Sequence, residues 1–223
     1  MRSDPVTDLD AQQIFRAATP EWLGGFGEAI WKNVLAASGW RYVSLTKICE
    51  GGAPLARGNN GHLILPDFDA YKDDRAVFVE AKAKTQSIVY RNKRQERHGI
   101  NQLNYQHYGE VQRQSGKPCC IGIVELWRES TDDLSLYWSG ALLFEKLVNL
   151  FDPRAENQET PPKVYWRRKQ FVELHAGLAP LELFSLARGA ATRTTNLPSI
   201  ASCFRSGKRH CSRGCGKTFS CPQ

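Results

Sequence analysis

The chain of 223 residues lacks the apolar segments that membrane insertion or secretion requires. No apolar run approaches the length of about 20 residues that spans a bilayer. The first residues, Met1 to Pro5, contain no apolar signal region. We therefore expect an intracellular, cytoplasmic protein without a membrane partner.

Several common catalytic motifs are also missing. The sequence contains no Gly-rich phosphate-binding loop and no Gly-x-Ser-x-Gly motif. The histidines His62, His98, His107 and His175 show no paired spacing typical of a metal site. No internal repeat or heptad pattern is present. The sequence therefore disfavours nucleotide-loop enzymes, serine hydrolases and repeat architectures.

The composition, with 41% apolar and 24% charged residues, is ordinary for a globular protein. The net charge of +7 is unevenly distributed. Residues 161–223 carry eleven Lys and Arg against two Asp and Glu, a net charge of +9, whereas residues 1–160 carry 19 against 21, a net charge of −2. A basic C-terminal part favours polyanionic partners, most often nucleic acid.

Of the seven cysteines, three lie in the body of the chain, at Cys49, Cys119 and Cys120, and four lie near the C-terminus. Cys119 and Cys120 lie in an apolar run and are predicted to be buried thiols. Four others crowd the C-terminal tail, with His210 beside one of them: Cys203, Cys211, Cys215 and Cys221. In an intracellular chain such clustering favours a tetrahedral Zn²⁺ site over disulfides. The tail lacks a Cys-x-x-Cys pair, so a basic tail with incidental thiols remains the alternative.

Periodicity predicts an α/β fold with a central mixed β-sheet flanked by helices. The expected helices span residues 21–38, 100–115, 141–151 and 180–186. The expected strands span residues 40–48, 62–65, 76–84, 119–127, 134–138 and 164–174. We expect the second and third of these strands, which are close in sequence, to pair as an antiparallel hairpin. The predicted parts are an N-terminal arm (1–20), the α/β domain (21–186) and a basic Cys-rich tail (187–223).

Acidic and basic residues gather around the predicted strand 76–84. Glu80 and Lys82 are two residues apart, so they share one face of the strand, while the alternating Val and Ala residues face the core. Asp67 follows Pro66 at a turn just upstream. Two carboxylates and an ammonium in one place suit a divalent metal site that activates water. Asp69 is a rival for Asp67, because it is two residues further along and shares its face.

These residues resemble the PD-(D/E)XK nuclease superfamily, the restriction-endonuclease-like enzymes. The resemblance covers roughly residues 24–125 and rests on five features of the chain: Pro66-Asp67, Glu80-Ala81-Lys82, Glu28 on the first helix, Gln102 on a later helix, and the order of helices and strands. It implies a restriction-endonuclease-like fold and a Mg²⁺-dependent endonuclease that hydrolyses DNA. Mn²⁺ is an alternative ion.

The resemblance also implies a role for each matching residue. Asp67, Glu80 and the backbone carbonyl of Ala81 would bind the metal, and Glu28 would assist. Lys82 would orient or activate the attacking water, and Gln102 would steady the site or the phosphate. Some branches of the superfamily have a tyrosine four residues after the glutamine. This chain has Gln106 there, with Tyr105 and Tyr108 nearby, so the role of the tyrosines stays open.

A basic stretch follows the strand and is predicted to contact phosphate through Lys84, Arg91, Lys93, Arg94 and Arg97. Two other functions stay open: a nucleic-acid-binding module of the same fold without cleavage, and a structural protein in which Glu80 and Lys82 form a surface ion pair. The substrate structure, the choice among a restriction enzyme, a junction resolvase and a phage or mobile-element nuclease, and homodimerisation are likewise open.

Overall fold

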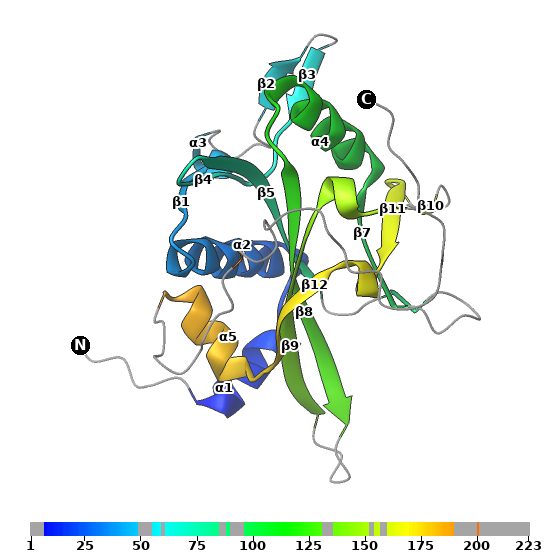
Figure 1. Ribbon diagram of the computed structural model, residues 1–223. Helices are drawn as coiled ribbons and strands as arrows, with labels where there is room; N and C mark the ends of the chain where they lie inside the picture. Colours follow the sequence, from blue (N-terminus) through cyan, green and yellow to red (C-terminus); the bar gives the residue numbers. More distant parts are fainter. Residues whose placement is uncertain are drawn as a thin grey trace, which may run out of the picture.

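A mixed β-sheet of six strands forms the centre of the computed structural model (Figure 1). Its strand order is β1 (Arg41–Ser44), β4 (Phe68–Lys72), β5 (Arg75–Lys84), β8 (Cys119–Ser130), β9 (Leu136–Lys146) and β12 (Val172–Leu178). The β5–β8 pair is parallel, and the other neighbours are antiparallel. The structure describes residues 7–48, 55–58, 61–84, 88–89, 96–130, 136–151, 154–156, 160–189 and 200.

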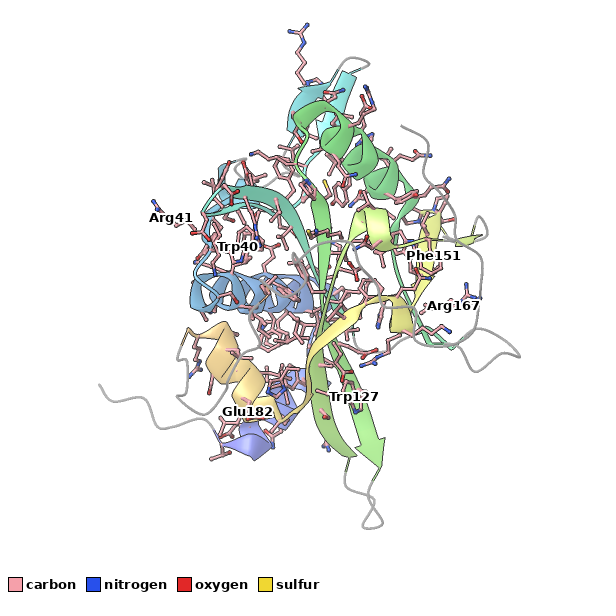
Figure 2. The ribbon with its side chains drawn as sticks, in the orientation of Figure 1. Trp40, Arg41, Trp127, Phe151, Arg167 and Glu182 are labelled. Carbon is pink, nitrogen blue, oxygen red and sulfur yellow. The ribbon has the colours of Figure 1, made fainter. Side chains whose placement is uncertain are left out.

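Helices cover one face of this sheet. On that face lie α1 (Asp8–Arg16), α2 (Pro20–Ala37) and α5 (Pro180–Ala187). On the other face lie α4 (Gln102–Ser115) and a four-stranded sheet of β10 (Arg154–Glu156), β11 (Lys163–Arg167), β7 (Glu96–Asn101) and β6 (Ile88–Val89). Figure 2 shows Trp40 on the side of α2 and Phe151 and Arg167 on the side of the second sheet.

The central strands are apolar on both faces because each face has its own hydrophobic core. Along β8, Cys120, Val124 and Leu126 pack into the core beneath α2, while the intervening Ile121 and Ile123 pack into the core beneath α4. This burial on both faces is typical of strands covered by helices on either side. The predicted buried thiols, Cys119 and Cys120, are confirmed, and both are free cysteines.

The helix α2 confirms the prediction for residues 21–38 to within one residue. Its N-terminus is capped by Thr19, whose hydroxyl accepts a hydrogen bond from the Trp22 N–H at 3.2 Å. Pro20 occupies the first turn, where its missing N–H costs nothing. Just after the helix, Gly39 adopts a φ of 78°, which stops the helix. Each end is therefore encoded locally.

The contact between α2 and β5 depends on Gly27. A methyl group at this position would lie 3.0 Å from the Ala83 backbone nitrogen and 3.1 Å from its Cβ.

We expect Gly27→Ala to lower the free energy of unfolding by about 1–2 kcal/mol, because the strand backbone cannot move aside as a flexible side chain can. Urea denaturation provides the measurement. Gly25→Ala is the matched control, since nothing lies within 4 Å of a methyl there and stability should not fall. Equal losses in the two variants would contradict this contact.

The prediction of a helix over residues 141–151 is wrong. Residues 136–146 form β9, which pairs with β8 from Leu136↔Ser130 to Lys146↔Cys120, and a short 3₁₀ helix η1 (Leu147–Asn149) follows. Leu142 and Phe144 enter one core, while Ala141 and Leu143 enter the other. A strand buried on both faces is apolar throughout, so its pattern does not differ from that of a buried helix.

The predicted strand pairing at residues 62–65 is also wrong. The strand β3 (Gly61–Ile64) pairs with β2 (Leu55–Gly58) in a separate two-stranded sheet. The antiparallel partner of β5 is β4, which begins directly after Asp67. A tight turn at residues 73–74, with Asp73 at a φ of 53°, closes this hairpin. The partner of β5 is therefore the strand that directly precedes this turn.

Two other strand predictions need correction. The predicted strand 40–48 ends at Ser44, and α3 (Leu45–Ile48) follows it. The predicted strand 164–174 is divided by a 3₁₀ helix, η2 (Arg168–Gln170), into β11 and β12, which belong to different sheets. The residues from Arg167 to Gln170 are all polar, so the sequence contained a sign of this break that the strand prediction overlooked. The helix predicted over residues 180–186 is confirmed as α5.

The predicted arm and tail both contain residues of the core. In the described part of the arm, α1 places Ala11 and Phe15 in the core beside Phe184 of α5. In the predicted tail, Ile200 is also fully buried in this core. The four tail cysteines and His210 lie outside the described residues, so the zinc site remains a prediction. Among the described residues, no helix is long and apolar enough to cross a membrane.

Candidate active site

Asp67 lies at the end of the β4–β5 hairpin and reaches across to the backbone of β5. Its Oδ2 accepts a hydrogen bond from the Ala81 N–H at 2.7 Å. The β4–β5 register ends at Phe68↔Val79, so Ala81 lies just beyond the end of β4. In an extended strand, the N–H and C=O of one residue point toward the same side. The Ala81 carbonyl therefore leaves β5 on the side of Asp67.

Glu80 and Lys82 share one face of β5, as the alternation of the strand predicts. The Lys82 ammonium forms a close ion pair with the Glu80 carboxylate. Glu80 is 2% exposed, whereas the Lys82 side chain is 31% exposed. Val77, Val79 and Ala81 take the opposite face and enter the core beneath α2. The interpretation of Glu80 and Lys82 as a surface ion pair does not fit a glutamate buried to this degree.

A tyrosine of α4 donates a hydrogen bond to the Glu80 oxygen that does not pair with Lys82. The Tyr108 hydroxyl donates to Glu80 Oε2 at 2.6 Å, and Asn104 Nδ2 donates to the Tyr108 hydroxyl at 3.2 Å. Tyr108 is 2% exposed. Asn104 and Tyr108 are four residues apart and therefore lie on one face of the helix. Sequence reasoning noticed Tyr108 but did not assign it a role and missed Asn104.

Gln102 is described only through its backbone and its place on α4. It is the first residue of α4, and its backbone N–H donates to the Pro162 carbonyl at 2.9 Å. In the described part of the chain, the hydrogen bond from α4 to Glu80 comes from Tyr108. A role for Gln102 toward phosphate remains a prediction.

Glu28 faces this group from α2. Its Oε2 accepts a hydrogen bond from the Thr46 hydroxyl at 3.4 Å, and the Ser44 and Thr46 hydroxyls lie 3.1 Å apart. Glu28 is partly exposed, and its charge contributes to raising the pKa of Asp67. The helix α2 therefore brings a third carboxylate toward Asp67, as the sequence predicts.

The rival carboxylate, Asp69, belongs to a different cluster. Both of its oxygens accept hydrogen bonds from the Lys117 ammonium, at 3.0 and 2.8 Å, and the Tyr71 hydroxyl also contacts it. The Lys117 ammonium lies 4.7 Å from the centre of the Tyr71 ring. Asp69 is thus already neutralised by a lysine, and Asp67 is the better candidate for the site.

The electrostatics of Asp67 show how closely the carboxylates are packed. Burial, followed by the charge of Glu80, raises the pKa of Asp67 to about 8, although Lys82 and the Ala81 N–H oppose the rise. Burial lowers the pKa of Lys82, but Glu80, Asp67 and Glu28 outweigh it and the net pKa is raised. Burial and the neighbouring Glu80 raise the pKa of Tyr108 well above its ordinary value. At neutral pH, Lys82 is therefore a cation and Tyr108 is a hydrogen-bond donor.

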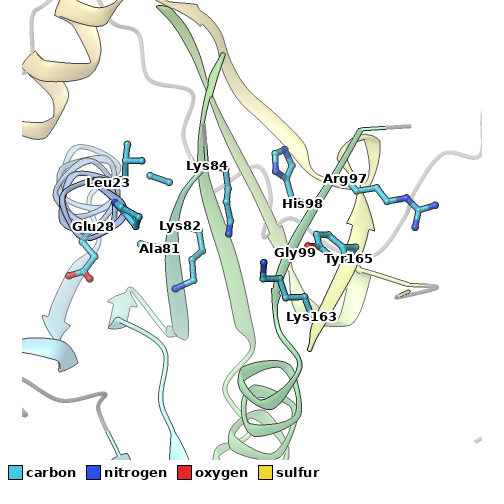
Figure 3. A pocket seen from close by; sticks show the side chains of 13 residues that line it. Leu23, Glu28, Ala81, Lys82, Lys84, Arg97, His98, Gly99, Lys163 and Tyr165 are labelled. Carbon is cyan, nitrogen blue, oxygen red and sulfur yellow. The ribbon is translucent and has the colours of Figure 1, made fainter. Parts of the chain in front are cut away.

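A cleft of about 510 Å³ opens beside these residues (Figure 3). One wall is formed by α2, with Pro20, Leu23, Gly24 and Glu28, and the opposite wall is formed by β7 and β11. The floor is the end of β5, from Ala81 to Lys84. The second sheet adds Lys163 and Tyr165, which sequence reasoning did not consider. The cleft is basic, because Glu28 is the one carboxylate among the lining residues that the structure describes.

The predicted phosphate contacts are only partly described. Lys84 and Arg97 both line the cleft. Arg97 is 2% exposed within β7, so it does not project from an open loop as the sequence suggested. The other three, Arg91, Lys93 and Arg94, lie outside the described residues. Their contact with nucleic acid remains a prediction.

The donor set fits a divalent cation held by few protein ligands. The carboxylate of Glu80 lies close enough to Asp67 to raise the pKa of Asp67, and a carbonyl leaves β5 on the same side. Oxygen ligands of this kind suit Mg²⁺, which keeps several waters. Within the described ranges, no group of three or more His, Cys, Asp or Glu side chains is arranged for a metal. A metal bound by Asp67 and Glu80 would therefore need the Ala81 carbonyl as a further protein ligand.

No family model and no curated protein matches the chain. Among solved structures, D212, a nuclease from a fusselovirus, resembles it with a TM-score of 0.31 and 7% identity, over 85% of this chain and 98% of that one. A TM-score of this size assigns neither a fold family nor an activity. Only the geometry of the site therefore bears on function.

Proposed function

We propose that this protein is a metal-dependent endonuclease of the restriction-endonuclease-like, PD-(D/E)XK type that hydrolyses DNA phosphodiester bonds. The observation that carries the proposal is the hydrogen bond from the Ala81 N–H to Asp67 Oδ2, which joins Asp67 to the Glu80–Lys82 pair at one end of β5. The basic cleft beside this group suits a polyanionic substrate.

The residues that would hold the metal are Asp67, Glu80 and the carbonyl of Ala81, with Glu28 assisting. Bound Mg²⁺, or Mn²⁺ in its place, would lower the pKa of a coordinated water and offset the charge of the phosphate. The burial of Asp67 and Glu80 strengthens their interaction with any cation, since the local dielectric constant is low.

Lys82 acts on the substrate as a cation. Because its pKa is raised, it does not serve as a general base at neutral pH. Its ammonium stabilises the negative charge that builds up on the phosphorus centre as the oxygen of water bonds to phosphorus. One ester P–O bond then breaks, the water loses a proton, and the departing oxygen gains a proton. Lys82 therefore lowers the barrier by electrostatic stabilisation.

Tyr108 and Asn104 orient the site without touching substrate. The Tyr108 hydroxyl fixes Glu80 Oε2, and Asn104 fixes Tyr108, so Glu80 presents its other oxygen toward Lys82. These are positioning residues. The burial of Tyr108 keeps water from competing for the Glu80 carboxylate.

The test is incubation of the full chain with supercoiled plasmid DNA in Mg²⁺ or in EDTA. We expect nicked and linear products in Mg²⁺ and none in EDTA. Glu80→Gln should abolish cleavage, because it removes the charge that Lys82 and the metal require. Glu110→Gln is the matched control, since Glu110 pairs with Arg113 on the exposed surface of α4.

Salt-dependent DNA binding without cleavage in any divalent metal would contradict the nuclease and support the alternative, a non-catalytic nucleic-acid-binding module. Equal cleavage by Glu80→Gln and the unchanged chain would place the activity elsewhere.

A further inference from the structure

The short helix α3 begins where the edge strand β1 ends, and its first residue contacts the backbone of Asp67. The β1–β4 pairing ends at Ser44↔Phe68. One residue further on, the Leu45 N–H donates to the Asp67 carbonyl at 2.8 Å. The Asp67 carboxylate accepts its own hydrogen bond from the Ala81 N–H of β5. Asp67 is therefore fixed through its main chain by α3 and through its side chain by β5.

The next residue of α3, Thr46, contacts the carboxylate of Glu28. Its hydroxyl donates to Glu28 Oε2 at 3.4 Å, and the Ser44 hydroxyl lies 3.1 Å from it. A hydroxyl has only one proton to donate. Because Thr46 donates its proton to the carboxylate, it accepts the proton of Ser44. The hydrogen bonds therefore run from Ser44 to Thr46 and from Thr46 to Glu28.

Glu28 needs such a contact because like charge repels it from the site. The charge of Glu28 contributes to raising the pKa of Asp67, which shows that the two carboxylates interact. Glu28 is also partly exposed, so its side chain can turn toward water. Among the described residues, the hydrogen bond that opposes this movement comes from Thr46.

We infer that Thr46 is a positioning residue of the metal site, which keeps Glu28 available to the cation that Asp67 and Glu80 would hold. The inference rests on the proposed function for the presence of that cation. Leu45 and Thr46 are adjacent, so α3 fixes Asp67 and Glu28 together. This gives α3 a role in the site, although Thr46 itself touches neither metal nor substrate.

The test measures the affinity of the full chain for Mg²⁺ without DNA, from the rise in stability to urea as Mg²⁺ is added to each variant's own metal-free baseline. Thr46→Val removes the hydroxyl and should raise the Kd for Mg²⁺ about tenfold, the lower end of the range for residues that orient a metal ligand. Thr46→Ser keeps the hydroxyl and should restore the affinity. Ser115→Ala is the control, because it removes a partly buried hydroxyl at the end of α4 and should not change the Kd.

A double-mutant cycle tests whether Thr46 acts through Glu28. In a Glu28→Ala background the hydroxyl of Thr46 has lost its acceptor, so Thr46→Val should cause no further loss of Mg²⁺ affinity. An undiminished loss in that background would overturn the inference, because Thr46 would then act by another route.

Three other outcomes would also overturn the inference: a chain that does not bind Mg²⁺, an unchanged Kd in Thr46→Val, and equal losses in Thr46→Val and Ser115→Ala. Mg²⁺ binding that depends on Thr46 in a chain that cuts no DNA would support the inference and contradict the proposed nuclease. Plasmid cleavage in Mg²⁺ with an unchanged Kd in Thr46→Val would contradict the inference alone. Failures of the two claims are therefore distinguishable.

Discussion

Replacing Lys82 by methionine is expected to slow DNA cleavage by about 10²–10³-fold at saturating DNA, which corresponds to about 2.7–4 kcal/mol of transition-state stabilisation. Methionine keeps most of the length of the side chain and removes the ammonium that pairs with Glu80. Because the charge on phosphorus grows in the transition state, the loss falls mainly on kcat. Single-turnover cleavage in Mg²⁺ measures it.

Lys84→Met is the matched control for this result. Lys84 is two residues further along β5 and lines the same cleft, but it is not in the ion pair with Glu80. Its replacement should raise KM and leave kcat nearly unchanged, since its contact with phosphate is the same in the ground and transition states. Equal losses of kcat in the two variants would show that Lys82 contributes only general positive charge.

The second large effect concerns the stability of the metal-free protein. The pKa of Asp67 is about 8 in the folded state, against an ordinary value of 3.8. The unfolded chain therefore releases this proton at lower pH than the folded one, and the contribution of Asp67 to stability falls as pH rises from about 4 to 8. The Asp67→Asn variant has an uncharged amide at this position, so its free energy of unfolding does not fall in this way as pH rises. The amide oxygen can still accept the hydrogen bond from the Ala81 N–H.

We expect Asp67→Asn to be more stable than the unchanged chain in EDTA at pH 8. Between pH 5 and pH 8, its advantage in the free energy of unfolding should widen by up to about 4 kcal/mol. Urea denaturation at the two pH values measures it. Mg²⁺ should stabilise the unchanged chain at pH 8 but not Asp67→Asn, because only the former has the ligand.

Asp69→Asn provides the control. It breaks the pair with Lys117 and should give no gain at pH 8. If Asp67→Asn showed no widening advantage between the two pH values, the Asp67 carboxyl would not be the buried, repelled group that the geometry describes. A stability gain at the cost of activity is common at catalytic sites.

Short-range patterns predicted which residues of β5 share a face and where α2 lies. Glu80 and Lys82 share a face because side chains alternate along any strand, and this holds whatever the partner strand is. The position of α2 followed from its apolar spacing and from Gly39. Glu28 was expected near Asp67 on the family resemblance, and α2 indeed brings it there. The alternation along β5 and the spacing of α2 depend on a few neighbouring residues, so the sequence contains this information directly, whereas the approach of Glu28 to Asp67 depends on how α2 packs.

These short-range patterns did not predict which strands pair with each other. Residues 141–146 are a strand because β8 and two cores surround them, although their own apolar pattern also fits a helix. The partner of β5 is β4, and no periodicity distinguishes this from pairing with β3. Both errors arise because pairing is decided by which strands meet, a property of the whole chain.

The amino-acid sequence by itself determined the candidates for the site: Glu80 and Lys82 on one strand face, Asp67 or Asp69 beside them and, through the family resemblance, Glu28. Only the tertiary structure decided between Asp67 and Asp69, because the choice depends on which of them reaches Ala81 and which reaches Lys117. It also brought Tyr108 to Glu80 and Lys163 to the cleft, across 28 residues in the first case and between two sheets in the second. Charge and strand alternation are local, whereas contact between distant segments exists only once the sheet and its layers have packed.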